Sequence, residues 1–66
     1  MKVKVNGDTH DFKKGTTITQ MLQCFDIESK RMAIEINGHV VKRSVWPQYT
    51  LSECDQIEII EFVGGG

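Results

Sequence analysis

The chain has 66 residues, a formal net charge of −1 and two cysteines. A chain of this length forms one domain with a small core, because it buries only about 60% of the surface that its unfolded form exposes. Its lysines and arginines are scattered and form no basic stripe, which argues against nucleic-acid binding. Apolar runs fall well short of the roughly 20 residues that span a bilayer, and the N-terminus does not form a signal peptide, so we expect a cytoplasmic protein without membrane association.

The first predicted element is a β-hairpin. Residues 2–5 alternate polar and apolar side chains, Asn6-Gly7 follows, and the strand pattern resumes over residues 9–12. An Asn-Gly pair between two short strands favours a type I′ turn, because both central residues of that turn need positive φ. The chain is therefore predicted to open with two antiparallel strands.

A short helix is predicted next. Lys14-Gly15 interrupts the strand pattern, and Thr17 stands three residues before Gln20, which has the form of a capping box. Apolar residues then recur with helical spacing along one face: Ile18, Met21, Leu22 and Phe25. We expect a helix of two to three turns that lies on a sheet.

The second half of the chain predicts a second hairpin. Residues 26–31 are mostly polar and form a loop, and residues 32–36 are a β-branched run closed by Asn37-Gly38. Residues 39–42 continue as a short partner strand. The repeated Asn-Gly signal makes the sheet assignment firm.

An irregular stretch and a last strand complete the chain. Residues 43–50 are interrupted by Pro47, and their large apolar groups are Trp46 and Tyr49. Aromatic side chains bury the largest areas, so we expect these two to cover the end of the core and not to bind a ligand. Leu51 and a turn over residues 52–55 lead into the last strand, which should run centrally in the sheet because most of its positions are apolar.

Side-chain alternation along the last strand, residues 57–62, assigns its two faces. If Ile57 and Ile59 point at the helix, Glu58, Ile60 and Phe62 point to the opposite face. Ile60 and Phe62, with the adjacent Val63, would then form an exposed apolar docking surface for a protein partner. The alternative is that Ile60 and Phe62 pack under Trp46 or Tyr49.

The cysteines and histidines do not form a recognisable reactive group. Cys24 falls in the predicted helix and Cys54 in a turn, and without a secretory signal both are expected to be free thiols with a structural or incidental role. His10 and His39 sit at the hairpins and are expected to be solvated turn residues. We therefore predict no metal site and no catalytic residues.

The chain ends on Val63-Gly64-Gly65-Gly66. A C-terminal glycine offers a carboxylate with no Cβ beside it, on backbone that adopts almost any φ and ψ. Such a tail, residues 63–66, can thread a narrow channel and reach a reagent inside a partner enzyme. The alternative is an ordinary frayed terminus or linker remnant.

The element order resembles the β-grasp, or ubiquitin-like, fold: an α+β domain over residues 1–62 with a mixed sheet of four to five strands packed on one helix, followed by the flexible tail. The whole chain is similar to the ThiS family of sulfur carriers of thiamine biosynthesis. The matching features are Ile36-Asn37-Gly38 with Val40-Val41, Arg43 and Trp46, Asp55-x-Ile57-Glu58-Ile59, and Phe62-Val63-Gly64-Gly65-Gly66. Two positions depart from the family pattern: Cys54, where many relatives have glycine, and Gly64, where many have another residue.

The resemblance implies a sulfur carrier acted on by other enzymes, and not an enzyme. A ThiF-type adenylyltransferase would use ATP and Mg²⁺ to convert the Gly66 carboxylate to an acyl-adenylate, and the chain itself would bind no cofactor. A persulfide supplied by a cysteine desulfurase or another donor would then leave Gly66 as a thiocarboxylate. This would donate sulfur to the thiazole synthase ThiG, with Gly64 and Gly65 as the slender lead into the partners' active sites.

Other functions share parts of this pattern. The small subunit of molybdopterin synthase has the same fold and terminal chemistry but is usually longer. A ubiquitin-like modifier joined to lysines would use the same glycine end. A β-grasp module that binds a ligand or RNA would not need the glycine tail at all.

Overall fold

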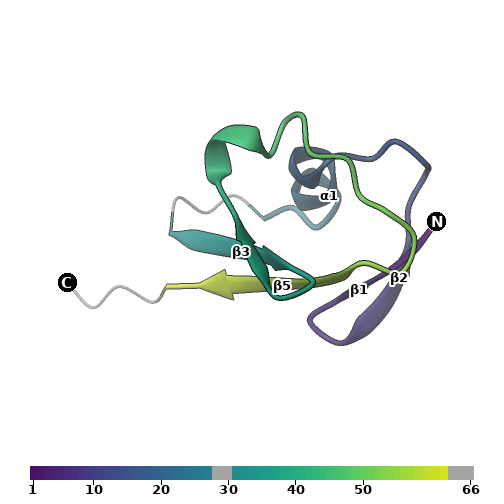
Figure 1. The fold of residues 1–66 in the computed structure, drawn as a ribbon, viewed down its shortest axis with the longest axis horizontal. Helices are drawn as coiled ribbons and strands as arrows, with labels where there is room; N and C mark the ends of the chain where they lie inside the picture. The colour runs from purple at the N-terminus through teal and green to yellow at the C-terminus, as the bar shows by residue number, and fades with distance from the viewer. Residues whose placement is uncertain (28–30, 63–66) are drawn as a thin grey trace.

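The structure, a computed structural model, describes residues 1–27 and 31–62. Its elements in chain order are β1 (Lys2–Val5), β2 (Asp8–Asp11), α1 (Ile18–Cys24), β3 (Met32–Ile36), β4 (His39–Val41), the 3₁₀ helix η1 (Arg43–Val45) and β5 (Gln56–Glu61). The strands form one five-stranded sheet in the order β2-β1-β5-β3-β4. Helix α1 lies over one face of the sheet, and none of the described elements covers the other (Figure 1). This is the predicted β-grasp arrangement.

Both Asn-Gly pairs form the predicted turns. Asn6 and Gly7 have φ of 50° and 87°, and Asn37 and Gly38 have φ of 53° and 85°. Positive φ at both central residues is the mark of a type I′ turn, which asparagine and glycine adopt most readily. The strands differ from the prediction by one residue at their ends, since β2 begins at Asp8 and β4 ends before Lys42.

Strand β5 occupies the centre of the sheet, as its apolar composition predicts. It runs parallel to β1, with Val5 opposite Ile57. It also runs antiparallel to β3 along the whole length of that strand. In Figure 1 it passes through the middle of the sheet, away from the end where the N-terminus lies. The strand that leads to the glycine tail is thus paired on both sides.

The helix begins at the predicted capping box. The Gln20 amide donates to Thr17 Oγ1 at 3.2 Å, and the Thr17 amide donates to Gln20 Oε1 at 3.0 Å. Each side chain satisfies an amide that the first helical turn leaves without a partner. Ile18, Met21 and Leu22 are buried, so the predicted stripe is the core face of α1.

The helix ends without a glycine. Asp26 adopts φ of 55°, and its amide donates to Gln23 O at 3.0 Å. The next amide, of Ile27, reaches back to Leu22 O at 3.0 Å. These two bonds make a Schellman motif, in which asparagine or glycine is more usual at the left-handed position. The partly buried Ile27 packs against the core and completes this turn.

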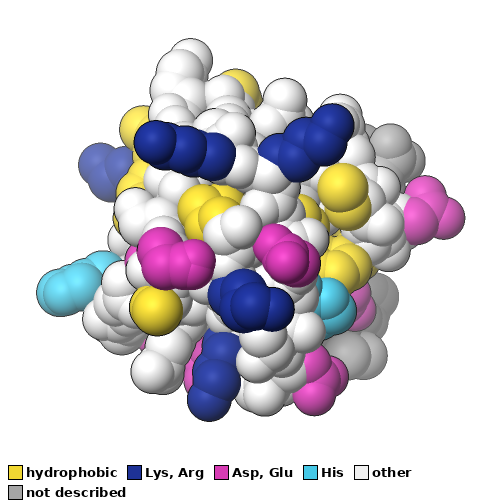
Figure 2. All heavy atoms as spheres, turned by 90° about the vertical axis from the view of Figure 1, so that its right-hand side faces the viewer, with side chains coloured by type: hydrophobic (Ala, Val, Ile, Leu, Met, Phe, Trp, Pro, Cys, Tyr) yellow, Lys and Arg dark blue, Asp and Glu magenta, His cyan; other side chains and the backbone are white. Residues whose placement is uncertain are grey.

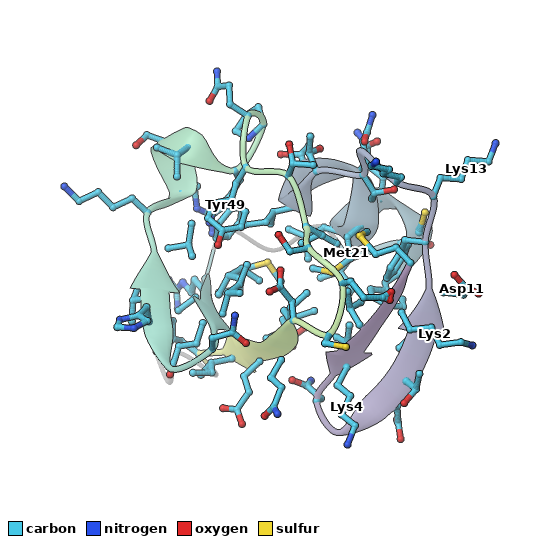
Figure 3. The ribbon with its side chains drawn as sticks, turned by 45° about the vertical axis from the view of Figure 1, so that its right-hand side comes forward. Lys2, Lys4, Asp11, Lys13, Met21 and Tyr49 are labelled. Carbon is cyan, nitrogen blue, oxygen red and sulfur yellow. The ribbon has the colours of Figure 1, made fainter. Side chains whose placement is uncertain are left out.

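The core lies between α1 and the sheet. It consists of Val3, Val5, Ile18, Met21, Leu22, Met32, Ile34, Ile36, Trp46, Leu51 and Ile57. Figure 3 shows Met21 pointing from α1 into this interior. Trp46 is 5% exposed and its Nε1–H donates to Val41 O at 2.9 Å, while Tyr49 packs against the core edge. The prediction that both aromatics cover the core is confirmed.

His10 corrects one prediction. It lies within β2 and is half-buried, and its ring meets that of Phe25 edge to face at a centroid distance of 4.9 Å. The register places it opposite the core residue Val3, which turns its side chain toward the helix side of the sheet. It is therefore a packing residue and not a solvated turn residue. His39 is exposed, as expected, but begins β4.

The surface charges are mixed. Figure 2 shows the end of the molecule nearest the N-terminus, where Lys and Arg side chains alternate with Asp and Glu over a few small apolar patches. This face has no continuous basic stripe of the kind that binds nucleic acid. Among residues 1–27 and 31–62, no helix is long and apolar enough to cross a membrane.

Candidate functional site

The candidate site is the end of β5, where the glycine tail begins. Of the residues predicted to react or to lead into a partner, Val63, Gly64, Gly65 and Gly66 lie outside the described residues. The structure places the strand that leads to them, from Gln56 to Phe62, and the groups that hold it. The last described amide, that of Phe62, donates to Arg31 O at 2.8 Å. Antiparallel pairing with the β3 side thus extends one residue beyond β5.

The two hairpin asparagines hold β5 from opposite sides. Asn6 Oδ1 accepts from the Ile59 amide at 2.8 Å, so a side chain continues the pairing where β1 has turned away. Asn37 Oδ1 accepts from the Gln56 amide at 2.9 Å. The sequence identifies both asparagines as turn residues, yet each also fixes the last strand. Nothing in the local pattern predicts this second role, because the partners are distant in sequence.

Asp55 is the anchor at the start of β5. It is 6% exposed, and its carboxylate accepts from Asn37 Nδ2 at 3.0 Å and from the Ser52 amide at 2.8 Å. Burial of a carboxylate is tolerated because both oxygens have donors. Asp55 thus joins the second hairpin, through Asn37, to the turn before β5.

The predicted faces of β5 are confirmed. Ile57 is 1% exposed, and Ile59 packs against the core from a partly buried position. Ile60 is half-buried and Phe62 is 57% exposed, and neither is among the residues packed against the core. The alternative, that they pack under Trp46 or Tyr49, is therefore wrong. The helix-free face of the sheet presents apolar groups next to the start of the tail.

The helix-free face carries a second feature beside these apolar groups. On it Ala33 lies opposite Ile60, and Glu35 lies opposite Glu58. Val40 follows on the adjacent strand and is 70% exposed. Lys4 points away from the helix layer at the β1 side of the same face (Figure 3). The face is thus apolar at the Ala33–Ile60 pair near the tail, and acidic at the Glu35–Glu58 pair, which lies further from the tail.

The described residues offer no metal centre or thiol pair. Within residues 1–27 and 31–62, no three His, Cys, Asp or Glu side chains are grouped so as to hold an ion. Cys24 and Cys54 are free and exposed, which confirms free thiols, and they lie at the end of α1 and in the turn before β5. Cys54 has φ of 69°, a left-handed conformation that glycine adopts without the steric cost of a Cβ.

The profile of the ThiS family matches residues 3–66. The Sulfur carrier protein ThiS of Bacillus subtilis is 34% identical over 97% of this chain and 98% of its own. The thiazole synthase of Magnetococcus marinus is 38% identical over the whole chain, which spans only 20% of that protein. Among solved structures, the crystal structure of the thiamine biosynthesis protein ThiS from Geobacter metallireducens superposes with a TM-score of 0.85 at 26% identity, covering all of both chains.

Proposed function

This chain belongs to the ThiS family, and we propose that it carries sulfur for thiazole formation in thiamine biosynthesis as a thiocarboxylate on Gly66. It is a co-substrate of its partner enzymes and performs no catalysis itself. The single observation that carries this proposal is the placement of the segment before the tail. A central strand, fixed on both sides, presents an exposed apolar face and leads directly into the sequence Val-Gly-Gly-Gly.

The chemistry begins with activation of a poor electrophile. A ThiF-type adenylyltransferase, using ATP and Mg²⁺, joins the Gly66 carboxylate to AMP and releases pyrophosphate. A persulfide from a cysteine desulfurase or another donor attacks the acyl carbon, and AMP leaves with the C–O bond electrons. The product is an acyl disulfide. A thiol then attacks its outer sulfur, forming a new disulfide and releasing the thiocarboxylate.

The glycines account for access to these reactions. A partner that performs adenylation must exclude water from the acyl-adenylate, so the reacting carboxylate has to enter a closed channel. Residues without a Cβ pass the narrowest channel and adopt whatever φ and ψ its walls require. Gly64 and Gly65 serve as this lead. The free carboxylate at Gly66 is itself part of the proposal.

Ile60, Phe62 and Val63 form the proposed docking surface. Exposed apolar side chains beside a reactive terminus gain binding energy when a partner covers them. Phe62 is 57% exposed in the free chain, so it has surface to bury. The strand beneath is held by Asn6 and Asn37, which gives the partner a rigid platform.

Thiazole synthase is the proposed acceptor of the sulfur. Two proteins named thiazole synthase, from Magnetococcus marinus and Paramagnetospirillum magneticum, contain a segment similar to the whole of this chain, 38% and 32% identical. The chain spans about a fifth of each, 20%. A carrier and its acceptor joined in one polypeptide act on each other at high effective concentration, which supports the pairing for the separate chain.

The test is the intact mass of the protein co-expressed with its ThiF-type adenylyltransferase and a cysteine desulfurase. We expect the mass increase of one sulfur-for-oxygen exchange, removed by alkylation of the C-terminal thiocarboxylate. Deletion of Gly65-Gly66 should abolish it without changing the thermal unfolding of the domain. An unmodified mass, together with no AMP formed from ATP, would refute the carrier function and favour the alternative that residues 63–66 are an ordinary frayed terminus.

Docking is tested separately by steady-state AMP formation. Phe62→Ser should raise the KM for the carrier and leave kcat at saturation unchanged, because it removes ground-state and transition-state binding equally. Val45→Ser is the matched control, because Val45 is also an exposed apolar residue, at 42%, but lies on η1 and not in the proposed docking surface. Equal effects of the two substitutions would refute a docking role for Phe62.

A further inference from the structure

We propose that Asn37 is a site of spontaneous deamidation. Folding protects its side-chain amide, and the aspartate or isoaspartate formed at this position prevents the hydrogen bonds at the start of β5 from forming again. The inference is independent of the proposed function, because it needs no partner enzyme and its reagent is water. It starts from two facts: Asn37 precedes a glycine, the neighbour that favours deamidation most, and its side chain is one of the groups that hold β5.

The reaction is balanced with water as the only reagent. The Gly38 backbone nitrogen loses its proton and attacks Cγ of Asn37, the Cγ–Nδ2 bond breaks, and Nδ2 leaves as ammonia with that proton. The ring that results, a succinimide, has two carbonyl groups. Water adds to one or the other and opens the ring to aspartate or to isoaspartate. The net change is an amide and water to a carboxylate and an ammonium ion.

The turn that carries this pair is open to solvent. Asn37 and Gly38 are both exposed, between β3 and β4. Apart from the chain neighbours of Gly38, no described residue has an atom within 4 Å of the position that a Cβ on this glycine would occupy. A side chain would shield the nitrogen of its own residue, and glycine has none. Solvent base can therefore reach the proton that the reaction removes.

The fold opposes the reaction through the Asn37 side chain. Its Nδ2 donates to Asp55 Oδ1 at 3.0 Å, and its Oδ1 accepts from the Gln56 amide at 2.9 Å. Ring closure has to bring Cγ within bonding distance of the Gly38 nitrogen, which displaces the side-chain amide from both partners. The bond to Asp55 involves a charged acceptor and belongs to the stronger class. Deamidation of Asn37 therefore requires that the contact between the second hairpin and β5 opens first.

The product cannot form the same bonds. Deamidation replaces Nδ2, a donor, by an oxygen that only accepts when the new carboxyl is ionised. That oxygen would face Asp55 Oδ1 at the 3.0 Å of the present bond, and two carboxylates at this distance repel each other. Asp55 is 6% exposed and its other oxygen accepts from the Ser52 amide, so its position is fixed. Isoaspartate also lengthens the backbone of the turn. One opening followed by reaction thus removes the Asn37 contact permanently.

Asn6-Gly7 is an internal comparison. It forms the same type of turn, with φ of 50° at Asn6 and 53° at Asn37. Asn6 Oδ1 accepts from the Ile59 amide at 2.8 Å, but its Nδ2 reaches Ile59 O only at 3.5 Å. An aspartate at position 6 would keep the acceptor that the shorter bond needs. The fold therefore protects Asn6 less than Asn37, and deamidation at Asn6 removes less stability.

The test follows deamidation of the full chain at mildly alkaline pH, with and without urea, by mass spectrometry after trypsin digestion. Trypsin separates the two sites into residues 5–13 and 32–42. Isoaspartate is identified by labelling with a protein-isoaspartate methyltransferase. We expect similar rates at the two sites in urea, because unfolding removes the contacts of both. In the folded chain Asn37 should react about tenfold or more slower than in urea, and Asn6 should be slowed by a smaller factor.

The stability of the product is tested with Asn37→Asp and its matched control Asn6→Asp. In thermal unfolding the Tm of Asn37→Asp should lie about 5 °C or more below that of Asn6→Asp, because only the first places a carboxylate against Asp55. Addition of Asp55→Asn to Asn37→Asp exchanges the donor and the acceptor of this bond. The double variant should therefore recover most of the lost Tm.

Three results would overturn the inference. The first is a rate at Asn37 that is the same in the folded chain and in urea, and the second is slower reaction of folded Asn6 than of folded Asn37. The third is a Tm of Asn37→Asp equal to that of Asn6→Asp, or one that Asp55→Asn does not restore. None of these measurements involves AMP formation or the C-terminal thiocarboxylate, so the proposed function stands or falls separately.

Discussion

Replacement of Asn6 by glycine should lower the free energy of unfolding, because it removes the hydrogen bond from the Ile59 amide to the Asn6 side chain. The turn sequence alone does not predict this loss. In Asn6→Gly the turn remains favourable, because glycine adopts positive φ as readily as asparagine. The acceptor of the Ile59 amide, at 2.8 Å, is lost, and with it the 3.5 Å contact from Asn6 Nδ2 to Ile59 O. The effect therefore reports the side-chain bond and not the turn.

The magnitude follows from two contributions. One good hydrogen bond contributes about 1 kcal/mol, and the longer contact adds little. Glycine adds about 0.5 kcal/mol through the greater freedom of the unfolded chain. The free energy of unfolding should fall by about 1.5 kcal/mol, and for a domain of this size each kcal/mol lowers Tm by about 4 to 8 °C.

The assay is urea unfolding followed by the fluorescence of Trp46, which is the single tryptophan and is buried. Asn6→Asp is the control, since it keeps an acceptor for the Ile59 amide and should lose less than about 0.5 kcal/mol. Hydrogen exchange should show faster exchange of the Ile59 amide in Asn6→Gly. If Asn6→Gly proves as stable as the wild type, or Asn6→Asp loses as much as Asn6→Gly, the side chain does not hold β5 as we argue.

Three further predictions concern the turn before β5 and the N-terminus. Asp55→Ala should lower the free energy of unfolding by about 3 kcal/mol in urea denaturation, because it leaves buried donors without acceptors. Cys54→Gly should raise it by about 0.5 to 1 kcal/mol, since φ of 69° strains a residue with a Cβ; a loss of stability would contradict this. The hydrogen bond from the Met1 ammonium lowers the pKa of the exposed Asp11 carboxyl. This stabilisation is present above the ordinary aspartate pKa and is lost as pH falls through the lowered one, so N-terminal acetylation should return the Asp11 pKa in an NMR titration toward its usual value.

Local features of the chain could be predicted because their causes lie within a few residues. The Asn-Gly turns follow from backbone sterics at two positions, and the capping box joins Thr17 to a residue three positions away. Helical spacing identifies the buried stripe of α1. Alternation along β5 assigns Ile57 to the core and Ile60 to the open face, as the structure has them.

Contacts between distant segments could not be predicted in this way. Asn6 meets Ile59 across 53 positions, and Asn37 meets Gln56 across 19. The sequence pattern predicts a solvated hairpin residue at His10. In the structure the pairing of β1 and β2 directs its side chain toward Phe25. Glu35 and Glu58 are visible in the sequence, but the fact that they lie opposite each other depends on the register of β3 against β5.

Local backbone preferences and periodicity are enough to predict the two hairpins, helix α1 and the buried faces of α1 and β5, and the glycine tail is read directly from the sequence. Which polar side chains hold β5, and which charges share a face, follows only from the tertiary structure. Strand register has a period of two, so a shift of one residue would exchange Glu58 for Ile57 or Ile59 on the open face. Packing of the apolar set against α1 selects the register, and that selection places Glu58 and Ile60 on the open face.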